Sequence, residues 1–152
     1  MSAGVQLLVF RLDGQRYGLP LASVERVVRI VEITPLPKAP EVVLGLINVQ
    51  GRVIAVVDVR RRFRLPPREP TLSDSLVIAR TPARAVALVA DSVTGVVECT
   101  ESDAVPAQAI VPGMEYIEGV AKMDDGMVLI HDLARFLSLD EDRRLDEAIT
   151  HA

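Results

Sequence analysis

The residues whose types most suggest catalysis are His131 and Asp132, which are adjacent in the sequence like members of a catalytic pair. Neighbouring residues on a strand point to opposite faces, so these two side chains are not expected to meet. The single cysteine, Cys99, and the other histidine, His151, have no metal-ligand spacing with them. Because a serine motif is also missing, the sequence predicts no catalytic residue, no metal and no cofactor, and we expect a protein that is not an enzyme.

Composition narrows the class of protein further. The 152 residues carry a net charge of −4 and include three Phe, two Tyr and no Trp. This charge and the scarcity of aromatic rings argue against nucleic-acid binding. No apolar run approaches the roughly 20 residues that span a bilayer, and the N-terminus has no signal-peptide pattern. We therefore expect a cytoplasmic protein with no nucleic-acid partner and no direct membrane insertion.

A repeated pattern organises the chain. Gly45 precedes Asp58 by thirteen residues, with an Asn-x-Gln-Gly turn at 48–51 between two apolar runs, and Gly119 precedes Asp132 by the same distance. A repeat that occurs twice in the same order predicts two similar β units. Two units are too few for a solenoid, so we expect them to pack on each other with a groove between them. Function is accordingly expected in binding.

Strand signals dominate the elements that would position these residues. Gln6–Leu12 and Gln15–Leu19 predict a hairpin around Asp13-Gly14, a pair that suits a type I′ turn. From Pro20 the chain predicts a brief helical turn and then a strand that runs to Thr34.

The later segments predict loops, strands and a terminal helix. Glu41–Leu46 is expected to form a helical turn, and the apolar run Val53–Val59 a strand buried on both faces. The proline-containing stretch 60–75 is expected to connect two halves. The predicted fold is mainly β, with subdomain 1 over about 15–75, subdomain 2 over about 76–139, and a C-terminal helix or tail over 140–152. The N-terminal strand, which precedes subdomain 1, is expected either to stand apart or to join subdomain 2.

Six short motifs follow one another in an order that is similar to the CheW family, the small coupling proteins of bacterial chemotaxis arrays. The resemblance covers roughly Val5 to Leu139. The motifs are Leu8-Val9-Phe10 with Tyr17-Gly18, Val24-x-x-Val27, Gly45-x-x-Asn48-x-x-Gly51, Val57-Asp58-Val59-Arg60, Val86 to Val97 with Asp91 and Gly95, and Ile117-x-Gly119 to Ile130-x-Asp132-Leu133.

The resemblance implies a fold and two partners. The fold would be two SH3-like five-stranded β-barrels packed side by side. The protein would bridge the cytoplasmic tip of a methyl-accepting chemoreceptor and the CheW-like regulatory domain of the histidine kinase CheA. An adaptor of a non-flagellar pathway, such as type IV pilus motility, is the alternative within the family. A small β-barrel enzyme or a nucleic-acid-binding module is the alternative outside it.

The resemblance also implies site residues. A barrel end is expected to bind the kinase through the apolar residues Val53 and Ile54, together with Arg52. Two positions depart from the family pattern, because Gln50 stands where an arginine is common and Arg26 where an acid is frequent. Either the charge in the groove has been rearranged or Arg52 substitutes from across the turn. The expected receptor-binding residues are Leu21, Val24, Arg26, Gly45, Asn48, Gln50 and Gly51.

Simpler structural roles compete with these assignments. Asn48 and Gly51 would also be explained by hairpin geometry alone. Asp58 and Asp132, which end apolar runs, are expected to cap the helical turns that follow. The basic stretch from Arg60 to Arg68 is expected to be a solvated face or, alternatively, a complement to an acidic partner.

Overall fold

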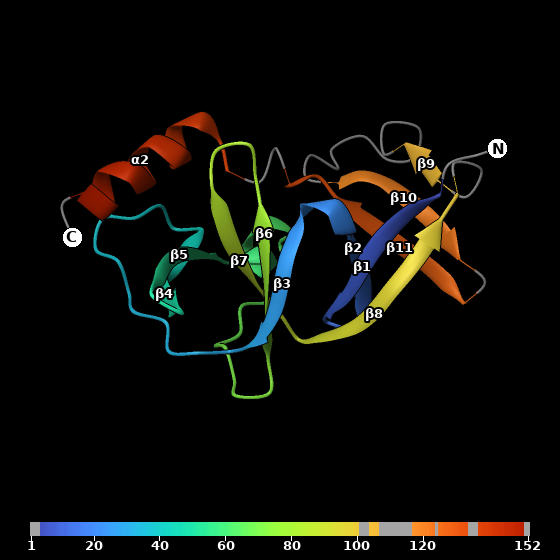
Figure 1. Cartoon of the computed structure of the whole chain (residues 1–152), viewed down its shortest axis with the longest axis horizontal. Helices are drawn as coiled ribbons and strands as arrows, with labels where there is room; N and C mark the ends of the chain where they lie inside the picture. The colour runs from blue at the N-terminus through green and yellow to red at the C-terminus, as the bar shows by residue number, and fades with distance from the viewer. Residues whose placement is uncertain (1–3, 101–103, 107–116, 124, 134–136, 151–152) are drawn as a thin grey trace.

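The computed structural model describes residues 4–100, 104–106, 117–123, 125–133 and 137–150. This part of the chain is mainly β, with short helical segments and one longer C-terminal helix (Figure 1). The helical segments are η1 (Leu21–Ser23), α1 (Val59–Arg62) and α2 (Leu139–Thr150). The strands are β1 (Val5–Leu12), β2 (Gln15–Pro20), β3 (Val24–Arg29), β4 (Val43–Val49), β5 (Arg52–Val57), β6 (Ser75–Arg80), β7 (Ala85–Ala90), β8 (Ser92–Cys99), β9 (Ala104–Pro106), β10 (Ile117–Met123) and β11 (Gly126–His131).

The strands form two sheets that lie side by side (Figure 1). Sheet A has the order β8-β1-β2-β11-β10-β9, and sheet B has the order β3-β6-β7-β5-β4. Without the short β9, the two orders match position by position, and each contains one parallel pair, β2 with β11 or β7 with β5. The predicted pair of SH3-like five-stranded units is confirmed. Within the described residues each unit is a hydrogen-bonded sheet that stays open between its edge strands.

The sequence repeat is confirmed by this match. Asp58 follows β5 and Asp132 follows β11, and these two strands hold the same place in their sheets. Gly45 and Gly119 both lie where the register of the strand pair shifts, as at a β-bulge. The thirteen-residue spacing thus reports the same bulged hairpin built twice.

The expected subdomain boundary differs from the sheets. The first repeat supplies β1 to β5 and the second supplies β6 to β11, but each repeat gives its first two strands to the other repeat's sheet. Sheet B therefore spans residues 24–90, whereas sheet A takes 5–20 together with 92–131. The division at about residue 75 does not describe either sheet.

The physical reason is that prolines mark where strands stop and do not determine which strands pair. The stretch 60–75 is a connection inside sheet B, between α1 and β6. The chain crosses between the sheets at η1 and at Asp91, and neither crossing contains a run of prolines. Strand pairing depends on hydrogen bonds between segments that are distant in the sequence, and local composition does not report them.

Local predictions had mixed outcomes. The Asp13-Gly14 hairpin is confirmed, with φ of 50° and 79° at its two turn residues. The helical turn over residues 41–46 is wrong, because β4 already starts at Val43. The strand that begins at Val24 ends at Arg29, and Thr34 makes only an isolated bridge to Leu46. The sequence also predicts a helix over 132–139 and a proline-containing loop at 106–112; of these, residues 134–136 and 107–112 lie outside the described residues, and Pro106 ends β9.

Three apolar clusters form the core. One lies within sheet B, one lies within sheet A, and the largest contains residues of both sheets and of α2. The prediction of a strand buried on both faces is confirmed from Ile54 to Val57, since Ile54 and Val56 belong to the sheet B cluster while Ala55 and Val57 belong to the shared one, but Val53 is exposed and Val59 begins α1. The shared cluster holds the two sheets together through apolar burial.

Helix α2 is confirmed but is not wholly exposed. A capping box begins it, in which Glu141 N–H donates to Ser138 Oγ at 3.0 Å and Ser138 N–H donates to Glu141 Oε1 at 3.0 Å. Leu145 is fully buried in the shared core, and Arg84 of the β6–β7 turn donates to Asp142 Oδ1 at 2.6 Å. The helix is therefore docked on the sheet B side of the molecule (Figure 1).

Candidate partner-binding surfaces

The β4–β5 hairpin forms one end of sheet B, and its tip presents several predicted site residues. Gln50 and Gly51 have φ of 52° and 83°, the signs that a type I′ turn requires. Asn48 Oδ1 accepts a hydrogen bond from the Gly51 N–H at 2.8 Å. The structural role of Asn48 and Gly51 is confirmed. Asn48, Gln50 and Gly51 are all exposed.

The hairpin tip is tied to the edge strand β3 by side chains. Arg26 Nη1 donates to Gln50 Oε1 at 3.2 Å, so the two residues that the resemblance suggests as departures from the family pattern contact each other. Beside them Arg52 grips Glu25 with bonds of 2.6 and 3.2 Å, and Arg80 lies 3.7 Å from the same carboxylate. The Arg52 hydrogen bond lowers the pKa of Glu25. Arg52 therefore pairs with Glu25, whereas Arg26 contacts Gln50.

Leu21 and Val24 lie where the chain crosses between the sheets. Both are partly buried and pack against the core that the sheets share, as does Val93 of β8. Val27 of β3 and Val96 of β8 are 40% and 49% exposed, on strands that occupy equivalent edges of the two sheets. The two strands carry matching Ser-Val-x-x-Val-Val segments, at residues 23–28 and 92–97.

Gly45 has a structural role rather than a surface one. It is buried with φ of 155°, and a Cβ built on it would lie 2.2 Å from the carbonyl oxygen of Thr34. Thr34 and Leu46 exchange two backbone hydrogen bonds of 2.8 Å at this point. Glycine is needed here because the neighbouring backbone passes too closely for a side chain.

The three predicted kinase contacts differ in exposure. Val53 is 61% exposed and pairs across the hairpin with Asn48. Ile54 is only 3% exposed and belongs to the sheet B core, so it offers no surface to a partner. Arg52 and Val53 therefore share one hairpin with the predicted receptor contacts, and the structure does not separate the two sets in space.

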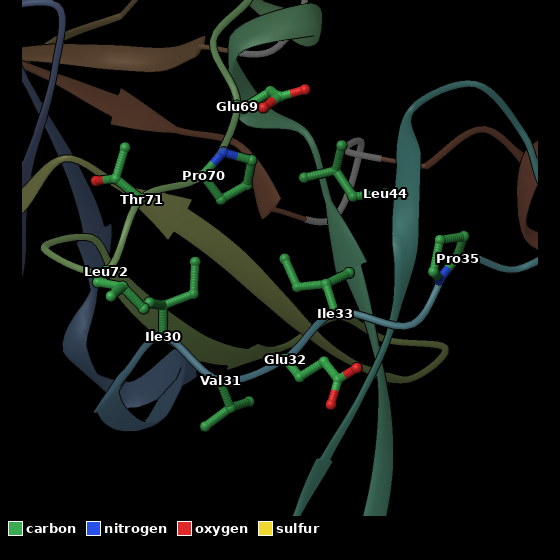
Figure 2. A pocket seen from close by; sticks show the side chains of 10 residues that line it. All are labelled: Ile30, Val31, Glu32, Ile33, Pro35, Leu44, Glu69, Pro70, Thr71 and Leu72. Carbon is green, nitrogen blue, oxygen red and sulfur yellow. The ribbon is translucent and has the colours of Figure 1, made fainter.

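The opposite end of sheet B carries a different surface, an open apolar pocket of about 810 Å³ (Figure 2). It lies where β3 ends and β4 and β6 begin. Figure 2 shows Ile30, Ile33 and Leu44 directed toward the segment that carries Pro70 and Leu72. Leu72 is 94% exposed. The lining residues are Ile30, Val31, Glu32, Ile33, Pro35, Leu44, Glu69, Pro70, Thr71 and Leu72.

The pocket was missed from the sequence because its two walls are distant along the chain. One wall is the segment 30–35 and the other is the segment 69–72. Strand pairing brings the two walls together, since Arg29 at the end of β3 pairs with Ser75 at the start of β6. In the described part of the chain, neither Glu32 nor Glu69 has an ion pair.

The basic stretch is not simply a solvated face. Asp58 caps α1 as predicted, since its Oδ1 accepts from Arg61 N–H at 3.3 Å. Arg60 is only 7% exposed and makes ion pairs inside the molecule, and Arg68 pairs with Asp74 at 2.9 Å. The residues from Arg60 to Arg68 therefore serve internal contacts to a large extent.

His131 lies in the interior. It is fully buried, its ring meets Phe63 edge-on with a centroid distance of 5.1 Å, and burial lowers its pKa to about 3. The imidazole is therefore neutral at physiological pH. Among the described residues no cluster of three or more His, Cys, Asp or Glu has metal-binding geometry. No described helix is both long and apolar enough to cross a bilayer.

Comparison with known proteins agrees with this architecture. The family model described as CheW-like domain matches residues 6–141. The chain is 28% identical over 134 residues to the chemotaxis protein CheW of Rhizobium meliloti (strain 1021), covering 87% of this chain and 86% of that one. It is 27% identical over 132 residues to the chemotaxis protein CheW of Thermotoga maritima, with 87% of each covered.

A solved structure agrees as well. The crystal structure of the scaffolding protein TtCheW from Thermoanaerobacter tengcongensis superposes with a TM-score of 0.83 at 29% identity, covering 91% of this chain and 96% of that one. Protein FrzA of Myxococcus xanthus is 29% identical over 106 residues, 66% of this chain. The exchanged pair of sheets, the bulged hairpins and these matches together establish that the chain belongs to the CheW family of non-enzymatic scaffolding adaptors.

Proposed function

We propose that this chain is a cytoplasmic adaptor that couples methyl-accepting chemoreceptors to the histidine kinase CheA in a chemosensory array. One observation carries the proposal. Sheet B exposes two unlike surfaces at opposite ends, a polar hairpin tied to β3 and an apolar pocket beyond the end of β3. Two partners can bind such a molecule simultaneously, as an adaptor requires.

The receptor surface is proposed at the hairpin end and the adjoining groove. Its polar part is Arg26, Asn48, Gln50 and Gly51, and its apolar part is Leu21 and Val24 where the sheets meet. Arg26 can fork onto a carboxylate of a receptor helix, a contact that glutamine at position 50 cannot make. Gly45 supports this surface from behind by letting β4 pass close to Thr34.

The kinase surface has two candidate positions. The family resemblance suggests Arg52 and Val53 with Ile54 behind them, at the hairpin. The pocket end offers an open apolar surface that contains none of the proposed receptor residues, which favours it for barrel-to-barrel contact with the CheW-like domain of CheA. Apolar area buried there would contribute on the order of 25 cal/mol per Å² before the costs of association.

Three exposed substitutions test these assignments. Arg26→Glu should weaken binding of a receptor cytoplasmic fragment by roughly 2 kcal/mol, the range of an interface hot spot, and leave kinase binding unchanged. Leu72→Asp should abolish kinase binding, and Val53→Asp should do so only if the hairpin is the kinase surface. Titration calorimetry with the receptor fragment and the isolated regulatory domain measures all three.

The controls follow from exposure. Leu72 and Val53 are 94% and 61% exposed, so each charged variant should fold, which circular dichroism checks. Loss of both partners in one folded variant contradicts separate surfaces. Full binding of both partners by all three variants overturns the proposed sites.

A pathway other than flagellar chemotaxis is the second candidate, since one matched relative is named Protein FrzA and not a chemotaxis protein. Affinity capture from the host distinguishes the two. Recovery of a chemoreceptor with CheA supports the first candidate, and recovery of a type IV pilus signalling kinase supports the second.

A further inference from the structure

Asp91 lies at the junction where the chain leaves sheet B and enters sheet A. Its carboxylate accepts from three directions. Arg60 Nη2 donates to both oxygens at 2.8 and 2.7 Å, Arg68 Nη2 donates at 2.6 Å, and the Asp13 N–H donates at 3.0 Å. One side chain thus gathers donors from α1, from the following loop and from the β1–β2 turn.

Arg60 makes the link between the sheets. Its helix follows β5 of sheet B, and its Nη1 donates to Asp13 Oδ1 at 2.6 Å in the β1–β2 turn of sheet A. The same nitrogen donates to the Pro66 carbonyl at 3.1 Å. Because the guanidinium is planar and 8% exposed, these bonds fix its orientation.

Arg68 makes a second link, from the junction to the pocket. It bridges Asp91 and the nearly buried Asp74, with N–O distances of 2.6 and 2.9 Å. Asp74 Oδ2 in turn accepts the Thr71 N–H at 2.8 Å. Thr71 and Leu72 are the residues that line one wall of the pocket.

We propose that Asp91, Arg60, Arg68, Asp13 and Asp74 form a clasp that fixes the angle between the two sheets and the position of the pocket wall together. The shared apolar core holds the sheets in contact, but apolar burial is non-directional and tolerates small rotations. Forked arginine–carboxylate bonds are directional, so the clasp supplies the orientation that the core does not. Asp91 accepts hydrogen bonds from both arginines, so it couples the angle between the sheets to the position of the pocket wall.

The clasp gives the adaptor a link between its two ends. Leu21 and Val24 of the proposed receptor surface lie where the two sheets meet, and the pocket is the favoured kinase surface. A partner that moves the pocket wall would change the angle between the sheets at Leu21 and Val24 through Asp91. This consequence rests on the proposed function, whereas the clasp itself does not.

Distances between spin labels test the clasp in the free protein. In a Cys99→Ala background, labels at Ala83→Cys and Lys122→Cys report the angle between the sheets, since these exposed sites lie in the β6–β7 turn and in β10. A second pair, Ala83→Cys with Leu72→Cys, reports the pocket wall. Double electron–electron resonance gives the distance distribution of each pair.

Each substitution has its own expected signature. Arg60→Gln should at least double the width of the inter-sheet distribution and leave the pocket-wall distribution narrow. Arg68→Gln should broaden only the pocket-wall distribution, and Asp91→Asn should broaden both. Arg60→Lys, which keeps the charge without the fork, should give an intermediate inter-sheet width.

Glu25→Gln is the matched control, because it removes an equally short arginine pair that lies within sheet B alone. It should leave both distributions unchanged, and circular dichroism confirms that every variant is folded. Unchanged widths in folded Asp91→Asn overturn the clasp, and so does equal broadening by Glu25→Gln. If Asp91→Asn does not fold, the separate signatures of Arg60→Lys and Arg68→Gln decide. Because no partner is present, failure here is distinct from failure of the proposed function.

Discussion

The two ends of sheet B use the same residue types for different purposes. At the hairpin end Arg52 pairs with Glu25, and their side chains are 49% and 28% exposed. At the pocket end Arg60 pairs with Asp91, and their side chains are 8% and 28% exposed. Arg52 binds Glu25 through both of its Nη atoms, with a shortest bond of 2.6 Å, whereas Arg60 gives Nη2 to both oxygens of Asp91, with a shortest bond of 2.7 Å, and Nη1 to Asp13. The two pairs differ in how far the arginine is exposed to solvent. The exposed Arg52 can exchange Glu25 for a carboxylate of a partner, whereas the buried Arg60 cannot.

Burial determines the consequence of breaking each pair. An exposed arginine that loses its carboxylate is solvated, so its side chain is available to another acid. A nearly buried arginine such as Arg60 that loses its carboxylates keeps the desolvation cost of its charge without compensation. The hairpin end is therefore suited to recognition and the joint near the pocket to fixed geometry.

The largest expected effect is at the joint. Arg60→Ala should lower the free energy of unfolding by about 2 kcal/mol, because it removes the charge-assisted hydrogen bonds that a nearly buried guanidinium makes to Asp91 and Asp13. Arg52→Ala at the hairpin should cost less than about 1 kcal/mol. Urea unfolding measures both values. Similar losses for the two variants would erase the proposed distinction between the ends.

A backbone substitution between the ends should have the next largest effect. Gly45→Ala would place a Cβ 2.2 Å from the Thr34 carbonyl oxygen, so the β4 backbone would have to shift. Gly51→Ala at the hairpin tip meets no atom within 4 Å and should cost only the left-handed penalty of about 1 kcal/mol. Thermal unfolding should rank Gly45→Ala as clearly the less stable variant, and the reverse ranking would contradict the close approach.

Acid should loosen the joint before it affects the apolar core. Burial alone would raise the pKa of Asp91, but hydrogen bonds from Arg60, Asp13 and Arg68 hold it below its ordinary value. A carboxyl whose folded pKa is lowered contributes stability above its unfolded pKa of about 4, and this is lost as pH falls through the folded pKa. The stability difference between wild type and Asp91→Asn should therefore be full at pH 7 and shrink below about pH 4. Urea unfolding across pH 2–7 measures it, and a constant difference would exclude this linkage.

The smallest effect on stability is expected at the hairpin. Gln50→Arg places a second guanidinium beside Arg26, and Arg26→Glu removes the first, so each change should alter stability by less than about 0.5 kcal/mol. The double variant places a carboxylate at position 26 beside a guanidinium at position 50, so these two side chains should form an ion pair. A double-mutant cycle in thermal unfolding should give a favourable coupling between the two positions, and zero coupling would mean that the contact is not formed in solution.

Much of the local structure was predictable from the sequence. Asp13-Gly14 and Gln50-Gly51 specify type I′ turns because both positions need positive φ. The buried run that became β5, the cap at Asp58 and the C-terminal helix were also predictable, since each depends on residues within one element. The contact between Arg26 and Gln50 was not, although both residues had been singled out, because 24 positions separate them.

The sequence by itself determined that this chain has two equivalent β units, since identical spacing forces the same bulged hairpin twice. Only the tertiary structure decided that each repeat lends its first hairpin to the other's sheet, that Ile54 is interior while Val53 is exposed, and that Asp91 gathers Arg60 and Arg68. Turns and strand patterns are set by neighbouring residues and are readable locally. Strand partners, pockets and buried ion pairs are set by which distant segments bury each other, and the folded chain alone decides that.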